Sequence, residues 1–406
     1  MNRTPLPLFD SIEYIDIQNN LYHLQDKYDL KDIKIITSFL KSYKGSQGTF
    51  NSYRREIERL LHWSVLIANK PLKELKRDDI EAFVAFCQKP PKHWIGKMKP
   101  ARFIVKDGKR IPNVKWRPFV VTVSKAAHRQ GIQPNAKNFE LSQASIKEVF
   151  AILGTFYNYL LQEEYTSMNP VALIRQKSKF IRKFQGQTKI RRLSELQWHY
   201  VITAAQKMAE VKPDVHERTL FIMSALYSMY LRISELTAAP RWTPMMSHFE
   251  RDSDGNWWFT TVGKGNKQRK IAVSNAMLAA LKRWRNYLEL PSLPSPTDNS
   301  CLLPKTKGKG PISNTSYIRK IVQFCFDKAM EDLRKDDFPE EAESMVGATV
   351  HWLRHTGISD DVKRRPREHV RDDAGHSSSA ITDKYIDVEL RERHQSARNK
   401  PIRDKD

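Results

Sequence analysis

Residues 247–273 read SHFERDSDGNWWFTTVGKGNKQRKIAV, and this stretch decides the fold class of the chain. The pairs DG at 254–255 and GN at 265–266 are turn sequences between runs that are rich in β-forming side chains. The pattern predicts a small three-stranded antiparallel sheet, with Lys264 on its second hairpin.

Helical patterns lie on both sides of this predicted sheet. Residues 217–238 form an almost wholly apolar pattern, which predicts a buried helix. Further helices are expected over 275–289, over 314–335 and beyond residue 350. The predicted fold class is therefore mainly α with a small antiparallel β-sheet.

The first half of the chain contains a second helical region. A helix is expected from Thr49, with apolar residues on one face and charged residues, among them Glu58 and Arg59, on the other. Helices are also expected from Asp78 through Phe86 and over 142–162. Asn169-Pro170 is expected to end this region.

A basic stretch interrupts that region at 89–129. It holds twelve Lys or Arg and a single acid, Asp107, with aromatic side chains interleaved. DGKR at 107–110 predicts a hairpin turn between FIVK and IPNV. The stretch is either a DNA-contacting insertion or a basic surface loop above buried aromatics, and both readings stay open. The candidate DNA contacts are Lys97, Lys99, Arg102, Lys109 and Arg110.

A second basic stretch, RQKSKFIRKFQGQTKIRR at 175–192, holds eight basic residues and no acid. It is expected to be an interdomain linker. If the linker crosses a DNA backbone, then Arg182, Lys183 and Arg191 are candidate phosphate contacts, although basic linkers without that role are also common.

The formal net charge of the 406-residue chain is +23, which favours a polyanionic partner, above all double-stranded DNA. No apolar run approaches the roughly 20 residues of a membrane span, so no membrane partner is expected. The first residues lack the apolar core of a signal peptide, and the three cysteines are scattered. A bacterial, cytoplasmic and DNA-associated setting is expected.

Several common chemistries have no motif in this sequence. GKGNK lacks the spacing of a nucleotide-binding P-loop, and neither H-E-x-x-H nor paired C-x-x-C occurs. The acids form no obvious cluster for two-metal chemistry. We therefore expect neither a metal nor another cofactor.

A metal-free phosphoryl transfer needs cations on the phosphate oxygens, an attacking group and an acid for the leaving oxygen. Six residues could supply these groups, namely Arg232, Lys264, His351, Arg354, His376 and Tyr385. Each residue alone has an ordinary structural reading, and their order and spacing together favour the functional one. Arg232 is expected inside the apolar helix, where Glu235 would anchor it, and Lys267 is the alternative to Lys264.

Four strings carry a specific resemblance: LRISEL, VGKGNKQRKIAV, HWLRHT and GHSSSAITDKYI. In this order they resemble the motifs of the tyrosine recombinase, or phage integrase, family. The resemblance covers about 193–390, and residues 49–87 and 142–175 look like the helical core-binding domain of the family. The sequence departs from the family pattern at Tyr230, where a Gly is usual, and over 360–374, where a leucine-rich helix is usual.

The resemblance implies a role for each candidate. Arg232 and Arg354 would clamp the scissile phosphate, and His351 and His376 would bind its oxygens and help to manage protons. Lys264 would protonate the leaving 5′ oxygen, and Tyr385 would attack to form a 3′-phosphotyrosine.

The resemblance also implies an architecture, a two-domain clamp on duplex DNA that works as a homo-tetramer on two DNA sites. The expected parts are an N-terminal extension (1–48), a core-binding domain (49–174) with an insertion at about 89–140, the linker (175–192), a catalytic domain (193–390) and a polar tail (391–406). The rival readings are a type IB topoisomerase, a DNA-binding regulator without catalysis, and a structural basic protein.

Overall fold

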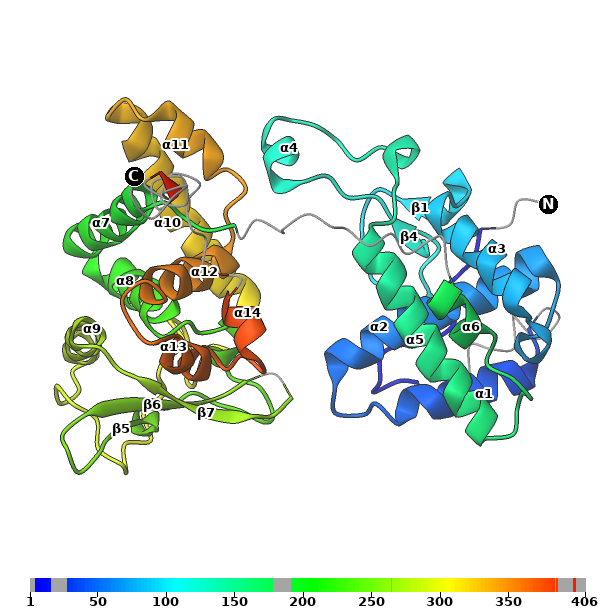
Figure 1. The fold of residues 1–406 in the computed structure, drawn as a ribbon, viewed down its shortest axis with the longest axis horizontal. Helices are drawn as coiled ribbons and strands as arrows, with labels where there is room; N and C mark the ends of the chain where they lie inside the picture. The colour runs from blue at the N-terminus through cyan, green and yellow to red at the C-terminus, as the bar shows by residue number, and fades with distance from the viewer. Residues whose placement is uncertain are drawn as a thin grey trace, which may run out of the picture. The chain divides into compact units, whose positions relative to one another are not determined.

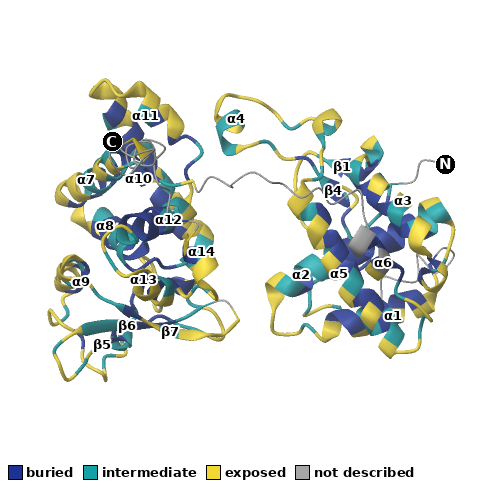
Figure 2. Cartoon of the chain, in the orientation of Figure 1, coloured by how far each residue is buried: buried dark blue, intermediate teal, exposed yellow. Residues whose placement is uncertain are grey.

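The computed structural model describes residues 4–15, 28–177, 191–263, 265–383, 385 and 397–398. The chain divides into two compact units, Met1–Gly186 and Gln187–Asp406 (Figure 1). In both units the buried residues line the inward faces of the helices, and exposed residues cover the outward faces (Figure 2). Among the described residues, no helix combines the length and apolarity that a membrane crossing requires.

Unit 1 is a group of helices around one apolar core. Its α-helices are α1 (Leu30–Lys41), α2 (Gln47–Trp63), α3 (Arg77–Gln88), α4 (Lys125–Arg129), α5 (Gln143–Gln162) and α6 (Pro170–Lys177). Its short helical turns are η2 (Ser64–Ala68), η3 (Leu72–Glu74), η4 (Lys92–Trp94) and η5 (Ala136–Asn138). The helices expected from Thr49, from Asp78 and over 142–162 are confirmed as α2, α3 and α5.

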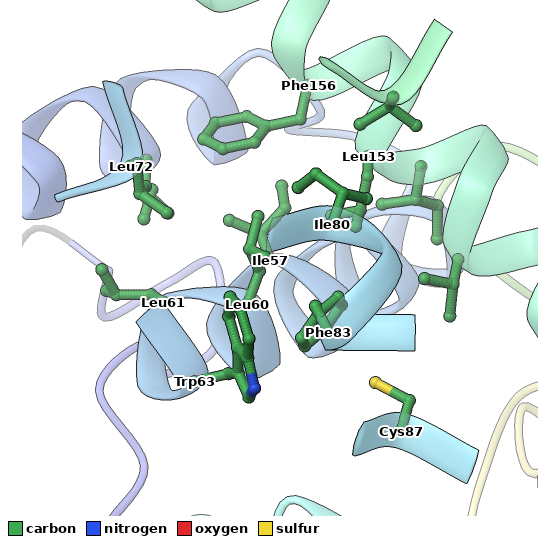
Figure 3. Packing of buried hydrophobic residues seen from close by; sticks show 14 of the residues in the cluster. Ile57, Leu60, Leu61, Trp63, Leu72, Ile80, Phe83, Cys87, Leu153 and Phe156 are labelled. Carbon is green, nitrogen blue, oxygen red and sulfur yellow. The ribbon is translucent and has the colours of Figure 1, made fainter. Parts of the chain in front are cut away.

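The core of unit 1 joins residues that are far apart in the sequence. Ile57 and Leu60 of α2 meet Ile80 and Phe83 of α3 and Phe156 of α5, and all five are fully buried (Figure 3). These positions recur at helical spacing, so each helix turns one apolar stripe inward. Burial of side chains of this size stabilises the unit by roughly 1.5–3 kcal/mol each.

Two elements of unit 1 differ from the expected pattern. Helix α1 lies within the range expected to be an N-terminal extension, yet its Ile36 and Leu40 belong to the same core. Asn169-Pro170 begins helix α6 instead of ending the region, because the Asn169 side chain accepts hydrogen bonds from the amides of Val171 and Ala172. Asn at the N-cap and Pro at the first helical position are both favourable.

The basic insertion folds into two small ribbons between α3 and α5. Strand β1 (Ile95–Gly96) pairs with β4 (Phe119–Val120), and β2 (Phe103–Lys106) pairs with β3 (Lys109–Pro112). The predicted hairpin at 107–110 is confirmed, with Asp107 and Gly108 at φ 51° and 72°. Positive φ at both central residues is the geometry of a tight hairpin turn, which Asp-Gly adopts readily.

The insertion covers the charged face of α2. Glu58 and Arg59, which the helical pattern sets opposite the apolar face, are 1% and 9% exposed. Arg59 donates to the carbonyl oxygen of Pro118 at 2.8–2.9 Å, and its guanidinium lies over the Phe119 ring. The charged face of α2 is therefore buried against the insertion. Helical periodicity alone would predict that this face is exposed to solvent.

Unit 2 places helices beside a small sheet (Figure 1). Its helices are α7 (Glu195–Val211), α8 (Pro213–Ser228), α9 (Asn275–Tyr287), α10 (Thr315–Lys335), α11 (Pro339–Ser344), α12 (Val350–Asp361), α13 (Arg367–Ala374) and α14 (Ser379–Asp383), with short turns η6 (Ile233–Glu235) and η7 (Met246–His248). The strands are β5 (Phe249–Arg251), β6 (Trp257–Val262) and β7 (Gln268–Ala272), paired antiparallel in that order. The predicted fold class, mainly α with a three-stranded antiparallel sheet, is confirmed.

The prediction of a helix over 217–238 is wrong after residue 228. Helix α8 ends at Ser228, and Tyr230 adopts a left-handed conformation with φ 49°. A residue in that conformation cannot continue an α-helix. The apolar side chains after Ser228 are buried in an irregular segment, and this is why the sequence there resembles a helix.

Candidate active site

Helix α12 carries three polar side chains on one face, His351, Arg354 and His355. A Cβ atom at Gly357 would collide with the carbonyl group of Tyr227 in α8, so only glycine allows this close packing. Leu353 is fully buried on the opposite side of the helix. The tight contact with α8 sets the position of the polar face.

Arg354 is held by main-chain carbonyl groups. Its side chain is 5% exposed and donates to the carbonyl oxygens of Tyr230 and Ala374. The left-handed turn at Tyr230 presents one of these oxygens, and the C-terminus of α13 presents the other. Burial, together with the nearby charge of Arg232, lowers the pKa of Arg354 to about 10.

Arg232 lies outside any α-helix, which corrects the expected placement. It precedes η6, and its amide donates to Glu235 Oε2 at 2.8 Å. Its guanidinium forms the expected ion pair with Glu235 at 3.0 Å. The predicted anchor is thus present, but a short turn holds it in place of a helical face.

Arg269 is a residue that the sequence analysis did not single out. It binds both carboxylate oxygens of Glu235 at 2.8 Å and donates to the Asp373 carbonyl at 2.9 Å. Burial opposes ionisation of Glu235, but Arg269 and Arg232 outweigh it and lower the pKa of that carboxyl. A sequence signal for Arg269 was available. It lies in the strand Gln268–Ala272 two positions before Ile271, which is fully buried, so both side chains are on the same face of the strand.

The hydroxyl of Tyr385 lies beside an imidazole that the sequence analysis also passed over. His355 Nδ1 and Tyr385 Oη are 2.8 Å apart. His376 stacks beside the Tyr385 ring, with centroids 5.6 Å apart, and its Nδ1 lies 2.9 Å from Thr382 Oγ1. The signal for His355 was its position in the quoted string HWLRHT, four residues after His351, where a helix brings both side chains to one face.

The charges of the arginines act on all of these groups. Burial lowers the pKa of His355 and of His376 to about 4, and Arg354 adds to the effect on both. Burial also raises the pKa of Tyr385, although Arg354 and Arg232 oppose that shift. At neutral pH the two imidazoles are therefore neutral and the phenol keeps its proton.

The departures from the family pattern form a connected network. Tyr230 packs with Ile358, Val370, Ala374 and Tyr385, and its hydroxyl bonds to Asp361. Within 360–374, Arg365 pairs with Asp373 at 2.6 Å, and Asp373 Oδ1 accepts the amide of Ala272 in β7 at 3.2 Å. Ion pairs and one tyrosine thus occupy the place expected for leucine packing beside His376.

Lys264 lies outside the described residues, in the connection between β6 and β7. Its neighbour Gly263 touches the arginine cluster, because a Cβ atom there would lie 3.1 Å from Glu235 Oε1 and 3.3 Å from Arg232 Nη1. Lys267 is exposed, and its carbonyl accepts the Gly263 amide at 2.8 Å.

The residues expected to contact DNA fall into three groups. Arg102 and Arg110 already have partners within unit 1, since Arg102 pairs with Glu58, and Arg110 pairs with Asp10 at 2.5 Å. The exposed ones are Lys97, Lys99, Lys109 and Arg191. Arg182 and Lys183 lie outside the described residues, as does most of the expected linker at 175–192.

The side chains around Tyr385 could together bind one anion such as a phosphate group. Arg232 and Arg354 offer guanidinium groups, which match pairs of phosphate oxygens, and His351 and His376 offer ring nitrogens. Within the described part of the chain, no three His, Cys, Asp or Glu residues are grouped so that they could hold a metal ion.

Comparison with known proteins agrees with this fold. No family model matches the chain. The tyrosine recombinase XerC of Chlorobaculum parvum is 25% identical over 172 residues, which span 40% of this chain and 46% of that relative's length. The XerC of Xanthomonas axonopodis pv. citri is 26% identical over 351 residues, or 85% of this chain and 88% of the relative.

A solved structure shows the same fold. XerH site-specific recombinase, bound to a palindromic difH substrate in a post-cleavage complex, superposes with a TM-score of 0.53 at 15% identity, covering 98% of this chain and 99% of that one. The motifs, the fold and the XerC likeness together make this chain similar to the tyrosine recombinases.

Proposed function

We propose that this chain is a site-specific DNA recombinase of the integrase or transposase type. It cleaves and rejoins DNA strands through a 3′-phosphotyrosine at Tyr385. The XerC and XerH likenesses support this class of activity. The proposed chemistry uses neither a metal nor a nucleotide, because the phosphotyrosine bond conserves the energy of the phosphodiester for rejoining.

The observation that carries the proposal is the surroundings of the Tyr385 hydroxyl. Burial raises the pKa of this phenol while the charges of Arg354 and Arg232 oppose that shift, His355 lies 2.8 Å from its oxygen and His376 stacks on its ring. A tyrosine that serves only for packing needs no cluster of cations around its hydroxyl. A nucleophile that attacks a phosphate needs one, since negative charge builds on the phosphate oxygens.

The family resemblance supplies the proposed roles, and the surroundings of Tyr385 support those of the arginines and histidines. Arg232 and Arg354 hold the scissile phosphate, His351 and His376 bind its oxygens, and Lys264 protonates the leaving 5′ oxygen. Glu235 is a positioning residue, because it is 1% exposed and binds Arg232 rather than the phosphate.

The partner is double-stranded DNA, bound as a clamp by a catalytic domain (193–390) and a core-binding domain (49–174) joined by the 175–192 linker. The working assembly is a homo-tetramer on two DNA sites. In the insertion we assign phosphate contacts to Lys97, Lys99 and Lys109, since Arg102 and Arg110 are occupied by carboxylates. The bacterial relatives support a cytoplasmic, DNA-associated setting.

Covalent capture tests the proposal. Purified protein and its Tyr385→Phe variant are incubated without metal with DNA that spans the ends of the element carrying the gene. Complexes that survive denaturant are collected, and the attached DNA is sequenced. We expect an adduct at a discrete site with the unchanged protein alone.

Other outcomes separate the rivals. Relaxation of any supercoiled plasmid by a monomer would indicate a type IB topoisomerase. Tight binding without an adduct would indicate a regulator. An adduct that persists in the Phe variant would assign the attack to another residue.

A further inference from the structure

His355 stands apart from the residues that the family resemblance assigns. It follows Arg354 directly in α12, and its ring is tilted by 39° to that of Tyr385 with centroids 5.5 Å apart. Among the described residues, His355 Nδ1 is the one hydrogen-bond partner recorded for the Tyr385 hydroxyl. A 2.8 Å separation lies within the range over which a proton passes directly between a base and a nucleophile.

The other two imidazoles are engaged differently. His376 meets the face of the Tyr385 ring at an interplanar angle of 20°, and its Nδ1 lies beside Thr382. His351 stacks on His355, with centroids 6.0 Å apart, and is exposed. In this arrangement His351 and His376 are free to bind phosphate oxygens, whereas His355 faces the hydroxyl.

We propose that His355 is a further catalytic residue, which accepts the proton of Tyr385 when the phenol attacks DNA. The inference rests on the proposed function. In the cleavage step the Oη–H bond breaks, an Oη–P bond forms, and the bond between phosphorus and the 5′ oxygen breaks. The proton moves to His355 Nδ1, and the leaving oxygen takes a separate proton from the acid, for which Lys264 is the candidate. Rejoining reverses each transfer.

The charges around His355 agree with this role. The groups that act on it are His351, Arg354, His376 and Tyr385, while Arg232 and Arg319 of α10 act on His351. Burial and the cations keep the imidazole neutral, which is the form that can accept a proton. An anionic phosphate between Arg232 and Arg354 would offset those cations and make His355 more basic when substrate is bound.

The first test needs no DNA. A neutral histidine that accepts at Nδ1 must carry its proton on Nε2. We expect nitrogen NMR of histidine-labelled protein, assigned with His355→Asn, to show an unprotonated Nδ1 whose shift changes in Tyr385→Phe. A protonated Nδ1 would overturn the proposal, because that atom could not take the phenol proton.

The second test measures the rate of adduct formation on the captured duplex. His355→Ala should react about 10²–10⁴-fold more slowly at neutral pH, with unchanged DNA affinity. The slow reaction should persist when sulfur replaces the leaving 5′ oxygen, because a thiolate leaves without a proton. Lys264→Ala, by contrast, should recover on the sulfur substrate. The matched control is His369→Ala, at an exposed position of α13.

The outcomes separate the inference from the proposed function. His355→Asn keeps a polar atom near Nδ1 but cannot take the proton, so it should stay slow. Full rate in His355→Asn would reduce His355 to a positioning role and overturn the proposal, as would a rate for His355→Ala within about twofold of the unchanged protein. No adduct with the unchanged protein would overturn the proposed function, and the inference with it.

Discussion

Both units bury arginines, but they compensate the charge in different ways. In unit 1, Arg59 pairs with Glu56 within α2 at 3.0 Å, and Arg102 pairs with Glu58, which joins the insertion to α2. In unit 2, Arg354 donates to two main-chain carbonyl oxygens and, within the described part of the chain, forms no ion pair. Arg232 shares Glu235 with Arg269, so two cations meet one carboxylate.

The difference separates structural arginines from ligand-binding ones. A buried ion pair that satisfies itself has no charge left for a partner. At the active site of unit 2, burial and the nearby charge of Arg232 lower the pKa of Arg354 to about 10, and Arg354 has no carboxylate partner among the described residues. An anion bound at that site would relieve the repulsion, whereas one bound at Arg102 would compete with Glu58.

The largest expected effect is on catalysis in unit 2. Arg354→Met should slow adduct formation by about 10³-fold, because the variant loses a donor to the developing charge on the phosphate. The free energy of unfolding should fall by only about 1–3 kcal/mol, because the carbonyl oxygens of Tyr230 and Ala374 lose a donor but no buried carboxylate loses its partner. Single-turnover cleavage and urea denaturation measure the two quantities. A large loss of stability would place Arg354 with the structural arginines of unit 1.

The matching change in unit 1 should have the opposite signature. Arg102→Met leaves Glu58 buried at 1% exposure with its charge unpaired. The free energy of unfolding should fall by about 3–5 kcal/mol, as is typical when one member of a buried pair is removed. Hydrogen exchange at the amides of α2 locates the loss, and the cleavage rate of the folded protein should stay the same. An Arg102→Met variant that is stable but binds DNA weakly would show that Arg102 is a DNA contact and not a structural arginine.

Acid should affect unit 2 more steeply than unit 1. Burial lowers the pKa to about 4 for His62 in unit 1 and for His355 and His376 in unit 2. Between about pH 6.5 and pH 4 the unfolded chain binds these protons and the folded chain does not, so stability falls as the pH falls. Hydrogen exchange across this range should show the steeper fall in α12.

Histidine variants isolate this contribution from that of Asp360 and Asp373, whose raised pKa values act in the opposite sense. His62→Gln should flatten the fall in unit 1 alone, and His376→Asn should flatten part of the fall in unit 2. If stability falls with pH equally steeply in the two units, and these substitutions do not change the slopes, then the buried histidines are not the cause of the acid sensitivity.

The smallest expected effect comes from the exposed lysines. Replacing Lys97, Lys99 and Lys109 with alanine should reduce the dependence of log K for DNA binding on log salt by about 0.9 per lost phosphate contact. The covalent step at saturating DNA should not change. Arg110→Ala is the control, because Arg110 pairs with Asp10 and should alter stability more than the salt dependence. An unchanged salt dependence in the lysine variant would leave the insertion with a structural role.

Local signals in the sequence predicted most elements. The Asp107-Gly108 hairpin, the antiparallel sheet and helices such as α5 were predicted because turn chemistry and periodicity act over a few neighbouring residues. The order and spacing of the four motifs also identified the candidate catalytic residues. The end of α8 was missed because the buried residues after Ser228 are as apolar as a core helix.

Local sequence patterns therefore predicted most of the elements, the fold class and the residues with reactive side chains. Only the tertiary structure decided which charges are compensated, because pairs such as Arg102 with Glu58 or Arg269 with Glu235 join residues that are 44 and 34 positions apart. The same holds for His355 and Tyr385, which are 30 positions apart. Periodicity reports the face of an element, while the partner on that face depends on how distant segments pack.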